Sequence, residues 1–231
     1  QVIKARALLN RNDPVGAAAA AAAVVTAFQY LSTHSVTAND NALWLQNISL
    51  RRYTMADGDG GNGLNFKTAN DPRIPPGPTS PATSFDAVTP WNSQGIWLNR
   101  TDPVIIASGI EARLIEAEAA LRANDAATFI AKLNVARATK AGLAPLTDPG
   151  TTTARVDLLF RERAFWMFST GHRLGDLRRM IRQYGRNAET VFPTGIYFKG
   201  GPMGTDVNFP IPQAEQNNPS DPQASCTDRL P

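Results

Sequence analysis

Charged side chains gather between residues 161 and 179, with types and spacings that suit anion binding or acid–base chemistry. Glutamate and arginine are adjacent near the middle of one expected helix, and an Arg–Asp–Arg series spaced by three residues opens the next. Residues three apart share a helix face, so the aspartate can pair with either arginine. Ion-pair networks often produce such clusters, and we expect this one to hold two helices and the tail together. The five residues are Glu162, Arg163, Arg173, Asp176 and Arg179.

Aromatic and polar side chains in a loop-rich middle segment have a chemistry that suits carbohydrate. Sugar rings present apolar C–H faces that stack on aromatic rings, while their hydroxyls seek amide and guanidinium groups. The candidate ligand-binding residues are Trp44, Tyr53, Trp91, Asn92, Trp97 and Arg100. As an alternative, the aromatic side chains anchor a long loop to the helices, since most large aromatic residues are packed. Trp166 lies in an expected helix among apolar neighbours and is predicted to be core.

Nucleophilic and metal-dependent catalysis have little support in this sequence. His34 and His172 are the only histidines, and neither has a second metal ligand at helical spacing. Cys226 is the only cysteine, so no disulfide and no zinc cluster can form within the chain. We predict no catalytic residue, no metal ligand, no cofactor and no enzymatic activity. A pair of carboxylates for glycoside hydrolysis stays open, because any two acids can converge in a fold.

A glycine-rich segment, residues 57–63, invites comparison with a calcium-binding loop. The helix-loop-helix calcium motif needs an oxygen ligand at position 5, glycine at position 6 and glutamate at position 12. Counted from Asp57, these positions hold Gly61, Asn62 and Thr68. The sequence favours a flexible loop and leaves an irregular calcium site open.

Composition and charge are those of an ordinary globular protein. The 231 residues are 42% hydrophobic and 19% charged, and the net charge of +3 is too small to indicate a polyanion as partner. Eight arginines lie between residues 155 and 186, but they spread around two expected helices, which argues against nucleic-acid binding. The longest apolar stretch, residues 16–25, is too short to span a membrane.

Hydrophobic periodicity and breaker residues predict an all-α fold of helical hairpins with a long loop-rich insertion. Asp13-Pro14 and Asp102-Pro103 each join a capping residue to a proline suited to the first helical position, so both predict helix starts. The alanine-rich run is predicted to be the second helix, as far as Phe28, and residues 173–184 are predicted to form the last helix. Gly142 and Gly185 are predicted to follow helix ends. The expected parts are a first hairpin over 1–30, the insertion over 31–101, a second hairpin over 102–142, and a helix pair with an extended tail over 151–231.

Three sets of motifs lie in order over roughly residues 103–219. The first set is the run from Glu111 to Ala119 followed by Leu133-Asn-Val-Ala-Arg137. The second set joins Arg161-Glu-Arg163, Gly171-His-Arg173 and Asp176-Leu-Arg-Arg179. The third set is Phe209-Pro-Ile-Pro-Gln-Ala-Glu215 with Asn217, Asn218 and Pro219. In order and spacing, the three sets together resemble the SusD/RagB family of nutrient-binding proteins.

The resemblance implies a single helical domain over residues 1–231, built on tetratricopeptide-like pairs and lacking its amino-terminal part. It implies an outer-membrane lipoprotein on the outer face of the cell, held by a lipid anchor on the missing amino terminus. In that family the protein caps a TonB-dependent, SusC-type transporter and captures a glycan or other nutrient. A periplasmic location and a structural or adaptor role in a larger assembly remain as alternatives.

Overall fold

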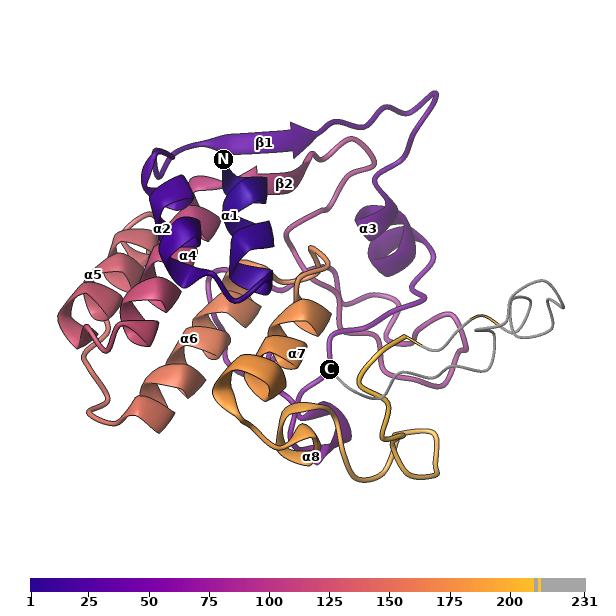
Figure 1. Ribbon diagram of the computed structural model, residues 1–231. Helices are drawn as coiled ribbons and strands as arrows, with labels where there is room; N and C mark the ends of the chain where they lie inside the picture. The colour runs from indigo at the N-terminus through magenta and orange to yellow at the C-terminus, as the bar shows by residue number, and fades with distance from the viewer. Residues whose placement is uncertain (210–211, 213–231) are drawn as a thin grey trace, which may run out of the picture. The chain divides into compact units, whose positions relative to one another are not determined.

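The computed structural model describes residues 1–209 and 212, which contain eight α-helices and a sheet of two short strands. Figure 1 shows the helices and the strands along the chain. The predicted all-α fold is confirmed in its coarser form, because most of the regular structure is helical. The predicted motif residues Glu215, Asn217, Asn218 and Pro219, and also Cys226, lie outside the described residues.

The chain divides into two compact units. The first unit joins residues 1–57 to residues 65–173, and the second joins residues 58–64 to the described residues from 174 onward. No helix among residues 1–209 and 212 is both long and apolar enough to cross a membrane.

The first unit opens with a helical hairpin of α1 (Val2–Asn10) and α2 (Pro14–Ala22). The side chain of Asp13 accepts a hydrogen bond from the Gly16 amide at 2.8 Å, and Pro14 is the first helical residue, as predicted. The expectation that this second helix runs to Phe28 is wrong, because the helix ends at Ala22 and strand β1 (Gln29–Ser32) follows.

The second hairpin begins later than Asp102-Pro103 predicts. Strand β2 (Val104–Ser108) follows the proline and pairs antiparallel with β1, with a bulge between Tyr30 and Leu31. A Val-Ile-Ile run is β-branched throughout and therefore favours an extended strand once a partner strand is present. Asp102 instead caps a turn, where its carboxylate accepts hydrogen bonds from the amides of Leu98 and Asn99.

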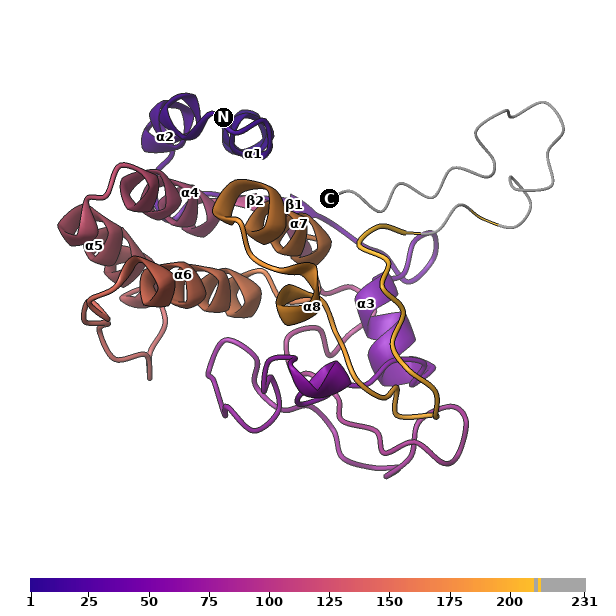
Figure 2. The ribbon, with the colours of Figure 1, turned by 60° about the horizontal axis from the view of Figure 1, so that its bottom comes forward.

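Helix α4 (Gly109–Arg122) is the centre of the first unit. The Ser108 hydroxyl caps it by accepting from the Glu111 amide. Helix α4 contacts α1, α2, α5 (Ala126–Arg137) and α6 (Thr152–Trp166). Figure 2 shows α4 between the α1–α2 hairpin and α6. Because it has neighbours on several sides, α4 buries residues all around its axis, including Glu111 and Glu118.

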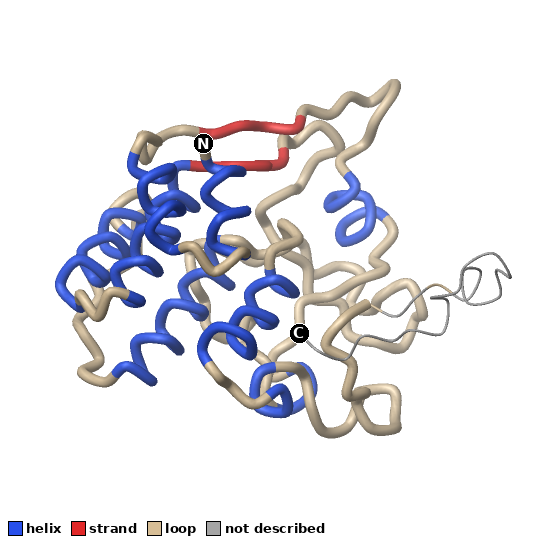
Figure 3. Tube along the Cα trace, viewed as in Figure 1, coloured by secondary structure: helices blue, strands red, loops and turns tan. Residues whose placement is uncertain are grey.

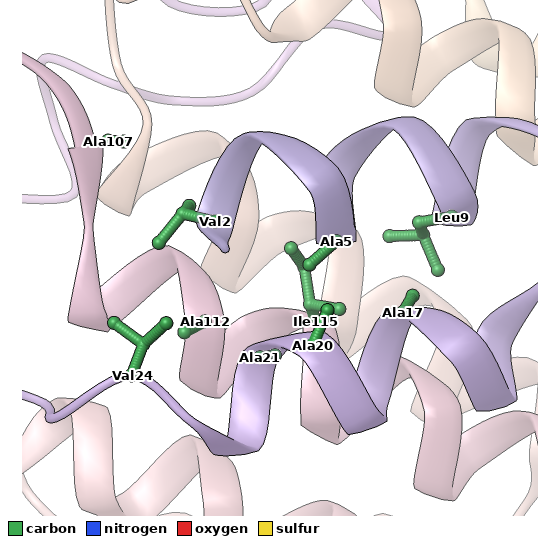
Figure 4. Close-up of a cluster of buried hydrophobic side chains, with 10 residues drawn as sticks. All are labelled: Val2, Ala5, Leu9, Ala17, Ala20, Ala21, Val24, Ala107, Ala112 and Ile115. Atoms are coloured by element: carbon green, nitrogen blue, oxygen red, sulfur yellow. The ribbon is translucent and has the colours of Figure 1, made fainter.

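Small side chains allow α1, α2 and α4 to approach closely. Six of the ten residues in this buried cluster are alanine, and Figure 4 shows them facing one another across the three helices and β2. The cluster comprises Val2, Ala5, Leu9, Ala17, Ala20, Ala21, Val24, Ala107, Ala112 and Ile115. The alanine-rich stretch of the sequence is therefore a close packing surface.

The segment between β1 and β2 is loop-rich, as the breaker residues predict, and Figure 3 shows it mainly as loop. Its regular parts are α3 (Ala42–Trp44), a π-helical turn (Leu45–Ser49) and a 3₁₀ turn (Asp59–Gly61), the last belonging to the second unit. Asn47 and Gln94, both fully buried, bond to backbone groups of this segment and fix its path.

The second unit contains α7 (Arg173–Tyr184), whose first residue still belongs to the first unit, and α8 (Ala188–Val191). The bounds of α7 and the left-handed Gly185 that follows it agree with the sequence prediction. The side chain of Asn62 donates to the Phe192 carbonyl at 2.8 Å and accepts from the Thr194 amide at 3.1 Å. These bonds tie residues 58–64 to the chain after α8.

Replacing Gly109 by alanine is expected to destabilise the protein by about 1–3 kcal/mol, the usual cost of overpacking. A Cβ at this position would collide with the backbone carbonyl oxygens of Val25 and Thr26. Chemical denaturation of the variant measures this change. Gly175→Ala is the control, since nothing lies within 4 Å of a Cβ there. Equal destabilisation by the two substitutions would contradict the close approach at α4.

Candidate functional site

A buried carboxylate joins three segments of the first unit. Glu162 in α6 is 3% exposed and accepts hydrogen bonds from Arg73 at 2.7 Å and from Arg137 at 2.8 Å. Arg73 also pairs with Asp71 at 2.6 Å. Burial by itself would raise the pKa of Asp71, but the hydrogen bonds from Arg73 outweigh it and lower that pKa. The loop segment, α5 and α6 are therefore held together by charge-assisted bonds.

A second buried carboxylate, Glu111 at the start of α4, lies beside side chains from two distant segments. Arg6 of α1 donates to both carboxylate oxygens, at 2.6 and 2.7 Å, and the His172 Nε2 lies 3.6 Å away. Thr170 Oγ1 lies 2.9 Å from His172 Nδ1 and donates to the Met167 carbonyl. Burial acts to raise the pKa of Glu111, but the hydrogen bonds from Arg6, with a smaller effect of the nearby His172 ring, lower it overall.

The structure distributes the five predicted ion-pair residues over both units. Asp176 and Arg179 form an ion pair at 2.7 Å within α7. Arg163 is 2% exposed in α6, and Arg173 is the half-buried first residue of α7. Sequence reasoning missed Arg73 and Arg137, the partners of Glu162, because they lie outside the segment in which the charged motif is visible. It also missed the pair of Arg6 with Glu111.

A pocket of about 780 Å³ lies in the first unit between the β1–β2 ribbon and the end of α6. Its walls are mainly apolar. From the ribbon side come Phe28, Pro103, Ile105, Ile106 and Ile110, and from the other side come Ile96, Trp97, Phe165, Trp166, Met167 and Phe168. Pockets of 300–1,000 Å³ with apolar walls and a few polar groups are typical of small-molecule sites.

Most polar groups of the pocket already have partners. Arg73 and Glu111 are in the ion pairs described above, and Asp102 accepts hydrogen bonds from the backbone. The Arg73 guanidinium also lies over the Trp166 ring, 5.3 Å from its centroid. The Trp166 side chain was predicted to be core. It is half-buried and lines the pocket.

One of the six sequence-predicted ligand residues, Trp97, lines the pocket. It is 5% exposed, and its indole N–H donates to the Pro103 carbonyl at 3.2 Å. Trp91 is equally buried, and its N–H donates to the Asn47 carbonyl at 2.9 Å. Both tryptophans therefore stabilise the loop segment through hydrogen bonds from the indole N–H to a backbone carbonyl.

The other four predicted ligand residues lie elsewhere in the loop segment. Trp44 is half-buried beside Arg100, whose guanidinium lies 5.8 Å from the ring centroid. Arg100 is exposed and pairs with Asp40. Asn92 donates to the Met55 carbonyl at 3.2 Å. Burial raises the pKa of Tyr53. The structure does not gather the six around the pocket.

Asp57 opens the glycine-rich segment for which the sequence favours a flexible loop and leaves calcium binding open. Its carboxylate accepts hydrogen bonds from the amides of Lys67 and Thr68, which closes a turn within the first unit. No group of three or more His, Cys, Asp and Glu side chains placed to hold a metal ion occurs in residues 1–209 and 212.

Glu162→Gln is expected to lower the free energy of unfolding by about 3–5 kcal/mol, the usual cost of breaking a buried ion pair. The substitution leaves the largely buried Arg137 with a neutral partner and removes one of the two carboxylates that face Arg73. Urea denaturation followed by circular dichroism measures the loss. Asp148→Asn, in the more exposed pair with Arg155, is the control and is expected to have little effect. Similar losses in the two variants would refute the central role of Glu162.

The lowered pKa of Glu111 predicts a component of acid instability. Its ordinary value is 4.5, so the stabilisation is complete above about pH 4.5 and is lost as the pH falls through the lowered folded-state pKa. The difference in unfolding free energy between the wild type and Glu111→Gln should therefore shrink between about pH 5 and the acid limit of folding. Denaturation curves at several pH values give this difference. A difference that stays constant with pH would show that Arg6 and His172 do not stabilise the ionised form.

Comparison with known proteins identified no relative of this chain. No protein-family model, no curated protein and no solved structure matches the chain. The assignment of a function therefore depends on the pocket, its surrounding charges and the sequence motifs.

Proposed function

We propose that this protein is a non-catalytic binding protein that captures a glycan or similar small nutrient for uptake. The observation that carries the proposal is the pocket of about 780 Å³ beside the β1–β2 ribbon. Its volume suits a short oligosaccharide or a molecule of similar size, and its aromatic side chains suit the apolar faces of sugar rings.

The aromatic lining supports capture. Trp97, Trp166 and Phe168 reach the pocket from the loop segment and from the end of α6. Hydrogen bonds and ring contacts hold Trp97 and Trp166 in place, through the Pro103 carbonyl and the Arg73 guanidinium. Rings that are already fixed lose little conformational freedom when a ligand binds, which favours affinity.

The state of the nearby carboxylates supports binding without catalysis. Glu111 has both oxygens bonded to Arg6, and Asp102 accepts hydrogen bonds from two backbone amides. Each carboxylate is held in its ionised form by these donors, whereas a general acid needs a proton to give at neutral pH. These two are the acidic side chains among the residues that line the pocket.

The partner and the location in this proposal come from the motif resemblance to the SusD/RagB family. On that basis the helical pairs are tetratricopeptide-like, the partner is a TonB-dependent, SusC-type transporter, and the protein lies at the outer face of the outer membrane. The antiparallel pairs α1–α2 and α4–α5, each with an Asn-Asp turn, are compatible with such repeats.

A glycan array on the folded protein tests the proposal, with a pocket-filling variant as the specificity control. Ile105→Trp adds a large ring to the pocket wall and is expected to weaken binding of any glycan hit by about tenfold or more. Leu31→Trp is the matched control, because Leu31 pairs with Ile105 across the ribbon but does not line the pocket. A flat array with wild-type protein would overturn the capture proposal.

The exposed apolar side chains of the ribbon favour an adaptor subunit as the second candidate. Phe28, Tyr30 and Leu31 are 40%, 60% and 39% exposed and follow one another along or beside β1. Apolar residues grouped in this way often mark a protein interface. A flat glycan array together with a stoichiometric native complex that Tyr30→Ser disrupts would favour this role over nutrient capture.

A further inference from the structure

The pocket has four ionisable side chains, and three of them are already matched by groups of the protein. Arg73 faces Asp71 and Glu162, Glu111 faces Arg6, and Asp102 accepts backbone hydrogen bonds. The fourth is Lys140, in the turn that follows α5.

Lys140 supplies a positive charge that no described residue neutralises. The residue is half-buried and lines a pocket with mainly apolar walls. A charge beside apolar surface is less screened by water, so it gains more from an anionic partner than a fully exposed lysine does. The net charge that the pocket offers to a ligand is therefore positive.

Trp166 supplies aromatic surface to the pocket wall. The Arg73 guanidinium lies over its ring, 5.3 Å from the ring centroid, and holds the indole in place. The indole Nε1 is covered by surrounding protein atoms, so a ligand in the pocket meets the ring and not the N–H. The pocket therefore joins apolar and aromatic surface to the charge of Lys140.

We propose that the ligand of this pocket is an amphipathic acid, with an apolar body and a carboxylate or similar anionic group. Lys140 neutralises the anionic group, and the apolar body packs between Ile105, Ile106 and Phe168. This inference rests on the proposed capture function and narrows its ligand class to acidic molecules, such as glycosides of uronic acids.

Octyl β-glucuronide and octyl β-glucoside form a matched pair of probes, because they differ in a carboxylate and share the ring and the chain. Titration calorimetry below the micelle concentration compares their affinities for the full chain. A charge-assisted hydrogen bond predicts that the glucuronide binds about tenfold or more tightly. The preference should shrink as salt is added, since the contact is ionic.

One pocket variant and one control assign the preference to Lys140. Lys140→Gln is expected to abolish the preference for the glucuronide, whereas Lys4→Gln, the same change on the exposed face of α1, should keep it.

The outcomes separate this inference from the proposed function. Equal affinity for both glycosides, removed by Ile105→Trp, would overturn the acidic ligand and leave capture in this pocket standing. A preference that survives Lys140→Gln would also overturn the inference. Absence of binding by either probe would overturn both the acidic ligand and the assignment of capture to this pocket.

Discussion

The carboxylate of Glu162 lies between the guanidinium groups of Arg73 and Arg137, and three segments distant in sequence meet there. The loop segment contributes Arg73, α5 contributes Arg137, and α6 contributes Glu162 itself. Charges buried in this way are stable only when they are paired and hydrogen-bonded, so the three segments must take up one specific arrangement. Much of the shape of the first unit follows from this constraint.

The pocket is a consequence of the same arrangement. Arg73 reaches α6 and holds the Trp166 ring, while Asn47 and Gln94 fix the loop that carries Trp91 and Trp97. On the opposite side, Arg6 and Glu111 join α1 to the start of α4, directly after the ribbon. The pocket wall is therefore supported from both sides by buried polar contacts, and such support keeps a binding site open in the absence of ligand.

The charged side chains that line the pocket differ in whether they are paired within the protein. Glu111 and Asp102 accept hydrogen bonds from Arg6 and from backbone amides, and Arg73 pairs with Asp71 and Glu162, which fits a structural role. Lys140 has no partner among the described residues. An anionic ligand of the kind proposed above would supply one.

The sequence by itself determined the local elements of this protein. Capping by Asp13, the bounds of α7 and the loop-rich middle segment were predictable, because they depend on residues close together in the chain. Tertiary structure decided which segments pair and which charges meet. Val104–Ser108 is a strand because it pairs with Gln29–Ser32. Glu162 pairs with arginines that lie outside its own sequence motif. Trp91 and Trp97 carry the same aromatic signal in sequence, yet only Trp97 lines the pocket. Such outcomes depend on long-range contacts, because distant segments pack where they can bury charged and apolar groups together.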